Sequence, residues 1–127
     1  MQQGRRKPIQ RERAEGDMVV KWFELQYPDE LLCHIPNELV RGCVQARIMV
    51  KAGLIPGMCD FVLFLPKGGH AGLCMEFKPT IRKGEPKPKE HPRQIAIIKH
   101  LNSRGYLAKI IYGFDAAKKF IDDYMKM

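Results

Sequence analysis

The sequence predicts an α/β domain with a mixed β-sheet flanked by helices, and three observations support this class. Several segments repeat apolar residues at the three- and four-residue spacing of amphipathic helices. Short apolar runs bounded by turn residues alternate with them, as expected of strands. The length of 127 residues suits one compact domain, and 45% hydrophobic with 28% charged residues indicates a folded chain.

Four segments carry the helical pattern. The predicted helices cover residues 11–26, 41–52, 94–104 and 114–125. In the first, the apolar stripe is formed by Ala14, Met18, Trp22 and Leu25, widened by Val19 and Phe23. In the second, the apolar positions are Val44, Ile48 and Met49. Gly53 and Gly105 follow the second and third helices, where glycine commonly ends a helix.

Four shorter segments are predicted to be strands. They cover residues 31–35, 61–65, 72–77 and 106–112. Residues 66–70 contain one proline and two glycines and form a hairpin-type connection. The second and third strands are therefore expected to pair antiparallel.

The charge of the chain points to a polyanionic partner. A formal net charge of +8 favours nucleic acid above other partners. The longest apolar run has five residues, whereas a membrane-spanning helix needs roughly 20. The charged N-terminal segment has no apolar core of a secretory signal, so we expect a cytoplasmic location without membrane contact.

The four cysteines, at positions 33, 43, 59 and 74, include no CxxC pair. His34 beside Cys33 comes nearest to a metal-ligand spacing, and a zinc site is not predicted. We expect reduced and partly buried thiols instead.

Three residues on the predicted hairpin carry the candidate chemistry. Asp60 stands at the entrance of an apolar strand, directly after a Pro/Gly turn, and Glu76 lies inside an otherwise apolar strand. An unpartnered carboxylate at such a position would be costly. Lys78 is two residues beyond Glu76 and therefore points to the same face. If the two strands pair, Asp60 comes to lie beside Glu76.

Two converging carboxylates suit a hard divalent cation, Mg²⁺ or Mn²⁺. Asp60 and Glu76 would bind the ion, with the Phe77 backbone carbonyl and waters completing its shell. The ion would polarise a phosphate and activate a bound water, which Lys78 would orient. The structural alternative is a Glu76–Lys78 salt bridge on an edge strand, with Asp60 as a turn cap.

An ordered set of motifs resembles the VRR-NUC domain, the virus-type replication-repair nuclease of the PD-(D/E)xK superfamily. The matching segments, within residues 14–124, are Gly57–Asp60, Phe61–Leu65, Gly72–Lys78, Gln94, Leu101–Tyr106, His34–Asn37 and Phe114–Tyr124. This resemblance implies a restriction-endonuclease-like core, with residues 12–127 as a single nuclease domain. The charged residues 1–11 before it are predicted to form a mobile basic arm. In that family proline usually precedes the aspartate, where this chain has Cys59, which removes no ligand but loosens the turn.

The resemblance also implies roles for individual residues. Asp60 and Glu76 would be metal ligands, Lys78 the catalytic lysine, and Gln94 a supporting residue at a helix start. A glutamate on the first helix would face the metal; Glu15 is the match and Glu12 the second choice. For either one, the alternative is a solvated residue near a helix N-terminus.

The resemblance further implies a homodimer acting on branched DNA, including four-way (Holliday) junctions. Trp22 and Phe23 fit either the core or a dimer interface. The loop after the candidate site is rich in basic residues, which would contact the DNA backbone without sequence preference. These residues are Arg82, Lys83, Lys87, Lys89 and Arg93. The arm would add Arg5, Arg6, Lys7, Arg11 and Arg13, unless loop and arm are merely solvated.

The function predicted from the sequence is therefore that of a metal-dependent DNA endonuclease. Two alternatives retain the fold without the chemistry: a non-catalytic nucleic-acid-binding domain, and a structural subunit of a larger assembly.

Overall fold

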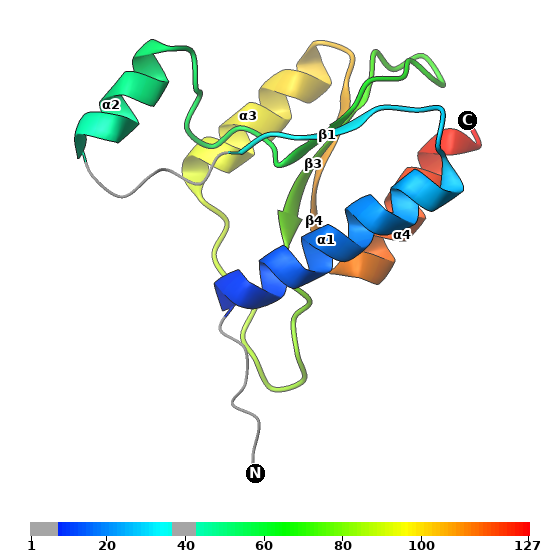
Figure 1. Ribbon diagram of the computed structural model, residues 1–127, viewed down its shortest axis with the longest axis horizontal. Coiled ribbons are helices and arrows are strands. Elements are labelled where there is room, and N and C mark those ends of the chain that lie inside the picture. The colour runs from blue at the N-terminus through cyan, green and yellow to red at the C-terminus, as the bar shows by residue number, and fades with distance from the viewer. Residues whose placement is uncertain (1–7, 37–42) are drawn as a thin grey trace.

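The computed structural model describes residues 8–36 and 43–127. Its elements follow the predicted order of helices and strands (Figure 1). They are α1 (Pro8–Gln26), β1 (Leu32–His34), α2 (Cys43–Lys51), β2 (Phe61–Leu63), β3 (Leu73–Lys78), α3 (Pro92–Ser103), β4 (Leu107–Tyr112) and α4 (Phe114–Met125).

The four strands form one mixed sheet in the order β1-β2-β3-β4. β1 pairs antiparallel with β2, and β2 pairs antiparallel with β3, so the predicted hairpin is confirmed. β3 and β4 are parallel, joined by a crossover that contains α3. The predicted α/β class with a mixed sheet flanked by helices is therefore confirmed.

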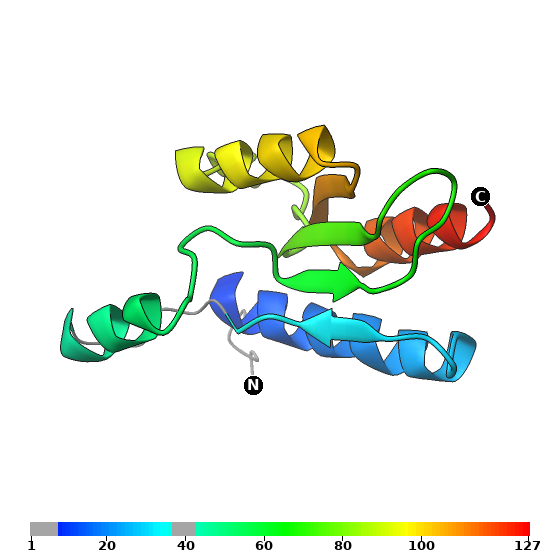
Figure 2. The same cartoon turned by 90° about the horizontal axis from the view of Figure 1, so that it is seen from above.

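Helices cover both faces of the sheet (Figure 2). α1 and α4 pack on one face, where Val19 and Phe23 meet Phe120, Ile121 and Tyr124. α3 covers the other face through Ile97, Ile98 and Leu101. β3 alternates between these two layers: its odd-numbered residues face α1 and α4, and Cys74 faces α3. Glu76 follows Cys74 by two residues and so belongs to the α3 side.

The buried face of α1 differs from the predicted stripe. Val19 and Phe23 are buried, whereas Met18 and Leu25 are exposed. Gly16 lies on the buried face, where an added Cβ would meet the Phe61 and Phe77 rings at 3.8 Å. This close approach centres the contact on Gly16, about one residue away from the predicted stripe. Phe23 therefore belongs to the core.

Several segment boundaries also differ from prediction, by one to three residues. α1 begins at Pro8, so residues 8–11 of the predicted arm are helical, while Arg5, Arg6 and Lys7 lie outside the described residues. β2 ends at Leu63, where its pairing with β3 also ends, and the Phe64 side chain is exposed.

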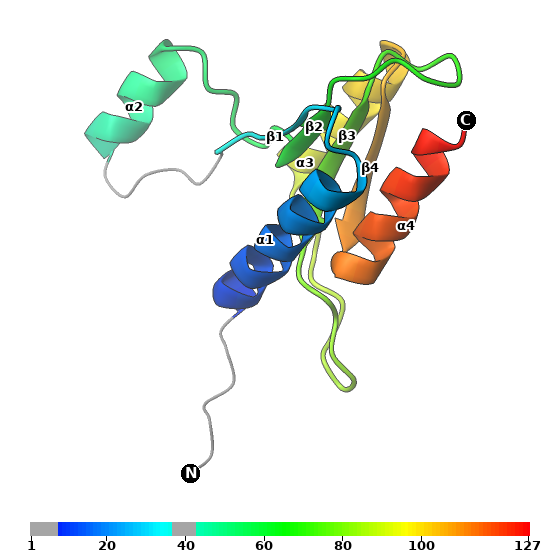
Figure 3. The same cartoon turned by 45° about the vertical axis from the view of Figure 1, so that its right-hand side comes forward.

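α2 lies to the side of the two layers (Figure 3). Its Val44 and Ile48 side chains are exposed, so the predicted apolar face of this helix is not part of the core. The predicted start of the helix, at residues 41 and 42, lies outside the described residues. No helix in the part of the chain that the structure describes is long and apolar enough to span a bilayer.

Candidate active site

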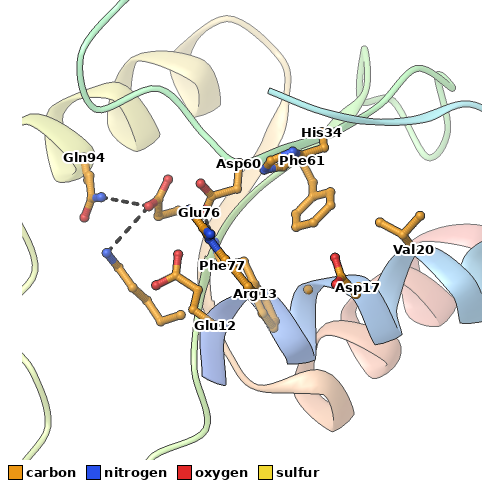
Figure 4. Close-up of a pocket in the computed structure, with 12 residues that line it drawn as sticks. Glu12, Arg13, Asp17, Val20, His34, Asp60, Phe61, Glu76, Phe77 and Gln94 are labelled. Atoms are coloured by element: carbon orange, nitrogen blue, oxygen red, sulfur yellow. Dashed lines mark hydrogen bonds and ion pairs between the residues drawn. The ribbon is translucent and has the colours of Figure 1, made fainter. Parts of the chain in front are cut away.

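Four of the predicted functional side chains meet in a pocket of about 270 Å³ between α1, the start of β2, the end of β3 and the start of α3 (Figure 4). Asp60, Glu76, Lys78 and Gln94 all contribute to its wall. The full lining consists of Glu12, Arg13, Gly16, Asp17, Val20, His34, Asp60, Phe61, Glu76, Phe77, Lys78 and Gln94. Residues far apart in the sequence are thus brought to one place by the β2–β3 pairing and by α3.

Asp60 is held from two directions at the start of β2. Its backbone carbonyl accepts a hydrogen bond from the Ile35 amide at 2.7 Å. Its carboxylate Oδ2 accepts one from the Phe77 amide on β3, also at 2.7 Å. Because Phe61 pairs with Met75, Asp60 lies opposite Glu76. The carboxylate therefore bonds to the neighbouring strand rather than to an amide of its own turn.

Glu76 is buried on β3, with 3% of its surface exposed. Its Oε1 accepts a hydrogen bond from Gln94 Nε2 at 2.7 Å and lies 3.6 Å from Lys78 Nζ. Its Oε2 is also buried, but it has no hydrogen-bond partner among the described residues. A buried carboxylate oxygen without a partner is costly in a folded protein. One half of this carboxylate is therefore left available to a ligand.

The two carboxyl groups are difficult to ionise together. Burial and, after it, the neighbouring Asp60 carboxylate raise the pKa of Glu76 to about 8, although the Lys78 ammonium opposes the rise. Burial also raises the pKa of Asp60, although the Phe77 amide and Lys78 act in the opposite direction. A cation between the two carboxylates would compensate both of these penalties.

Lys78 and Gln94 approach Glu76 from β3 and from the first turn of α3. Both contact the same oxygen, Oε1 (Figure 4). The salt bridge that was the structural alternative for Glu76 and Lys78 is therefore present, but it occupies only one carboxylate oxygen. Gln94 Oε1 is buried without a partner among the described residues. The pocket thus contains two unpartnered oxygens, one on Glu76 and one on Gln94.

The donor set fits a hard divalent cation with few protein ligands. Within residues 8–36 and 43–127, no group of three or more His, Cys, Asp or Glu side chains is arranged to hold a metal ion. The available donors are oxygens, which suits Mg²⁺ or Mn²⁺ rather than Zn²⁺. Mg²⁺ commonly uses one or two carboxylates and retains several waters, and the Asp60–Glu76 pair supplies that number.

The structure places Glu12, and not Glu15, in the pocket. The charge of Glu12 contributes to the raised pKa of Glu76, and Figure 4 shows both side chains facing the same space. Glu15 instead accepts a hydrogen bond from the Thr80 amide at 2.8 Å and a second from the Thr80 hydroxyl. Glu12 precedes Gly16 by four residues, so knowledge of the buried face would have identified it.

Two further pocket residues were not assigned to the site from the sequence. Asp17 comes from α1, and His34 comes from β1, where it pairs with Phe61 in the sheet register. The His34 ring centre lies 5.1 Å from that of Phe61, and its charge lowers the pKa of Asp60. The pairing of β1 with β2 carries the necessary information, but three-residue strands give too little pattern to fix a register.

The predicted DNA-binding residues occupy different surroundings. Lys89 and Arg93 line a second groove that also includes Lys78 and Gln94. Lys87 lies 4.0 Å from Glu90 and over the ring of Tyr112. Arg82 and Lys83 are exposed in the loop that precedes them.

Arg11, predicted as part of a mobile arm, is instead buried in α1 and has a structural role. Its guanidinium donates to both carboxylate oxygens of Glu85 at 2.9 Å and to the Thr80 carbonyl at 3.2 Å. Arg11 and Glu15 together fasten the loop after β3 to α1. Three hydrogen bonds of Arg11 are therefore made inside the protein rather than to a ligand.

Cys59, which stands where the resembled family has proline, is buried against α3 together with Cys74. A hydrogen bond with the Cys74 thiol, and then burial, raises the pKa of Cys59. Cys59 remains a neutral thiol that fills space behind Asp60, so its role in the described structure is packing.

A solved structure described as a VRR_NUC domain protein has the same fold. The two superpose with a TM-score of 0.74, and the alignment covers 98% of this chain and 92% of that chain at 22% sequence identity. No protein-family model matches the sequence, and no curated protein matches it. The resemblance drawn from the motifs is therefore confirmed at the level of the fold.

Proposed function

We propose that this protein is a metal-dependent DNA endonuclease that hydrolyses phosphodiester bonds with Mg²⁺ or Mn²⁺ as cofactor. The observation that carries the proposal is the buried, unpartnered Oε2 of Glu76 opposite Asp60, in a pocket that also presents Lys78. The fold similarity to a VRR_NUC domain protein supports the same chemistry, because VRR-NUC nucleases are the family that the motifs resemble.

Asp60 and Glu76 would hold the metal ion, with the Phe77 backbone carbonyl and waters completing its shell. Glu12 replaces Glu15 as the proposed glutamate of the first helix, because Glu12 lines the pocket. When bound, such an ion polarises the scissile phosphate and lowers the pKa of a coordinated water.

Lys78 and Gln94 would then serve the attacking water and the phosphate. The Lys78 ammonium neutralises negative charge that develops on the phosphate oxygens during attack. Gln94 fixes the Glu76 side chain through Nε2, and its buried Oε1 can accept a hydrogen bond from the attacking water. Gln94 would in this way help to position a water for attack on the phosphorus atom.

The proposed substrate is DNA, branched or double-stranded, with four-way junctions included. A net charge of +8 and the exposed cations of the loop after β3 support a polyanionic ligand. We propose that Arg82, Lys83, Lys87, Lys89 and Arg93 contact the DNA backbone. A homodimer would present two such sites to opposed strands of a junction. The proposed place of action is the cytoplasm of a bacterial or phage-infected cell.

Cleavage of labelled four-way junction, duplex and single-stranded DNA tests the proposal. The wild-type protein should cut at least one form with Mn²⁺ or Mg²⁺ and none with EDTA. Asp60→Asn should lower the cleavage rate by about a thousandfold or more, because a metal ligand is lost. The same variant should bind the DNA as the wild type does.

Asp115→Asn is the matched control, because Asp115 is exposed on α4, away from the pocket. It should cut at the wild-type rate. A wild-type protein that cuts no DNA form with either metal contradicts the nuclease proposal. If such a protein still binds DNA, the non-catalytic alternative replaces it.

A further inference from the structure

We infer that the groove on the α3 side of the active site binds a backbone phosphate of the DNA strand that is cut. This phosphate is a neighbour of the scissile phosphate, and the groove binds it without a metal ion. The inference rests on the proposal that the adjoining pocket acts on DNA. The DNA strand would then run across the protein from the first turn of α3 to Asp60 and Glu76.

The groove has a volume of about 370 Å³ and opens directly beside the active site. Lys78 and Gln94 belong to the walls of both cavities, so the two adjoin each other. The groove is lined by Pro56, Gly57, Lys78, Lys89, His91, Arg93 and Gln94. None of these residues is acidic, and three are cationic, which is the lining expected for a phosphate.

The cations of the groove differ from the other basic residues of the loop. Among the described residues, Lys89 and Arg93 form no ion pair with a carboxylate. Lys87, in contrast, lies near Glu90, and Arg82 lies close enough to Glu85 to lower its pKa. Lys89 and Arg93 therefore keep their full charge for a ligand.

The backbone at Gly57 packs closely against Arg93 in the wall of the groove. Gly57 has a φ of +84°, and a Cβ at this position would come within 2.9 Å of the Arg93 Cβ. The turn before β2 can therefore pack directly against the first turn of α3, which holds Arg93 in place.

His91 adds an oriented hydrogen-bond donor to the same groove. Its Nδ1 accepts a hydrogen bond from the Arg93 amide at 3.1 Å, which caps α3. The neutral imidazole therefore carries its proton on Nε2. This N–H is left for a ligand such as a phosphate oxygen.

The opposite side of the active site, formed by α1, lacks the cationic lining of the groove. Glu12 and Asp17 are acidic residues on the α1 side of the pocket, where Arg13 is the cation. A phosphate beyond the cut bond would be repelled by these carboxylates and attracted by Lys89 and Arg93. The charge distribution thus favours the α3 side for the neighbouring phosphate.

Binding of a fluorescein-labelled DNA duplex in EDTA, followed by anisotropy at several salt concentrations, tests the inference. The double variant Lys89→Ala/Arg93→Ala should weaken binding about tenfold at moderate salt, because two phosphate contacts are lost. A plot of the logarithm of the association constant against the logarithm of the salt concentration should become less steep by about 0.9 for each lost contact. The matched control is Lys118→Ala/Lys126→Ala, which removes the same charge from exposed positions on α4 and directly after it, outside the groove.

The control should weaken binding by less than about threefold, as expected of general screening charge. Equal losses in the two double variants, or no loss in the groove variant, would overturn the inference. Thermal unfolding of both variants verifies that each is folded. Binding through the groove without any metal-dependent cleavage contradicts the nuclease proposal alone, whereas cleavage with equal losses contradicts the groove alone.

Discussion

The two flanks of the candidate active site are built from opposite kinds of side chain. The α1 flank contributes the carboxylates of Glu12 and Asp17, whereas the α3 flank contributes the amide of Gln94 and the cation of Arg93. Glu76 lies between them, bonded to Gln94 and unpartnered at its second oxygen. The difference suggests a division of tasks: the α1 flank suits a metal ion and the α3 flank suits a phosphate.

The α1 flank itself combines two functions, which lie on different faces of the helix. Glu12 faces the pocket, while Arg11 and Glu15 bond to Glu85 and Thr80 in the loop after β3. Substitution of Glu12 should therefore affect the cleavage reaction, whereas substitution of Glu15, three residues later, should affect the stability of the fold.

The largest effect expected from the α1 flank separates Glu12 from Glu15. Glu12→Gln should lower the metal-dependent cleavage rate by about ten- to a hundredfold, because a carboxylate near the metal site is removed. Glu15→Gln should retain cleavage within about threefold at low temperature and instead lower the thermal midpoint, since its bonds to Thr80 weaken. Steady-state cleavage and thermal unfolding of both variants provide the comparison. A larger loss of cleavage in Glu15→Gln would return the first-helix role to that residue.

The second prediction concerns the pH dependence that Glu76 imposes on the metal-free protein. Its pKa is raised from an ordinary value of 4.5 to about 8 in the folded state, mainly by burial. Between these values the folded state binds more protons than the unfolded state, so stability falls as pH rises through this window. The slope from this group is at most about 1.4 kcal/mol per pH unit, and the raised pKa of Asp60 adds the same sign.

Urea unfolding in EDTA at pH 5 and pH 8 measures this effect, with Glu76→Gln as the control. The variant carries no titratable group at position 76, so it should lose less stability than the wild type over this interval. An equal loss in both proteins would show that Glu76 is not protonated in the folded state at pH 5.

The smallest expected effect concerns Arg11 and the loop that it fastens. Arg11→Ala removes the bonds to Glu85 and the Thr80 carbonyl, so amide hydrogen exchange in residues 79–91 should become faster. Lys21→Ala, at an exposed position of the same helix, is the comparison, and hydrogen exchange in that loop should stay closer to the wild type in this variant. Unchanged exchange in Arg11→Ala would mean that other contacts hold the loop.

Much of the fold was predictable because strand and helix periods are local properties. The alternation within residues 73–78 placed Glu76 and Lys78 on one face, and the hairpin placed Asp60 beside Glu76. The face of α1 was not predictable, because the contact of Gly16 with Phe61 and Phe77 depends on tertiary packing. That one-residue difference is also why Glu15 was preferred to Glu12.

The sequence likewise could not predict which basic residues line the groove and which contact other parts of the protein. Lys87 and Lys89 are two residues apart in the same loop, yet only Lys89 lines the groove. Arg11 was interpreted as part of a mobile arm, because its partner Glu85 is 74 positions away in the chain. Long-range pairs of this kind leave no local pattern.

Anomalous diffraction from crystals soaked in Mn²⁺ tests most directly the proposal that Asp60 and Glu76 form a divalent metal site. The soak should be made above pH 8, because the raised pKa of Glu76 leaves its carboxyl protonated at lower pH. The account predicts one manganese peak within coordination distance of Asp60 and of Glu76 Oε2, absent in Glu76→Gln. A peak only elsewhere, or no peak with Glu76 Oε2 bonded to a protein group, would contradict it.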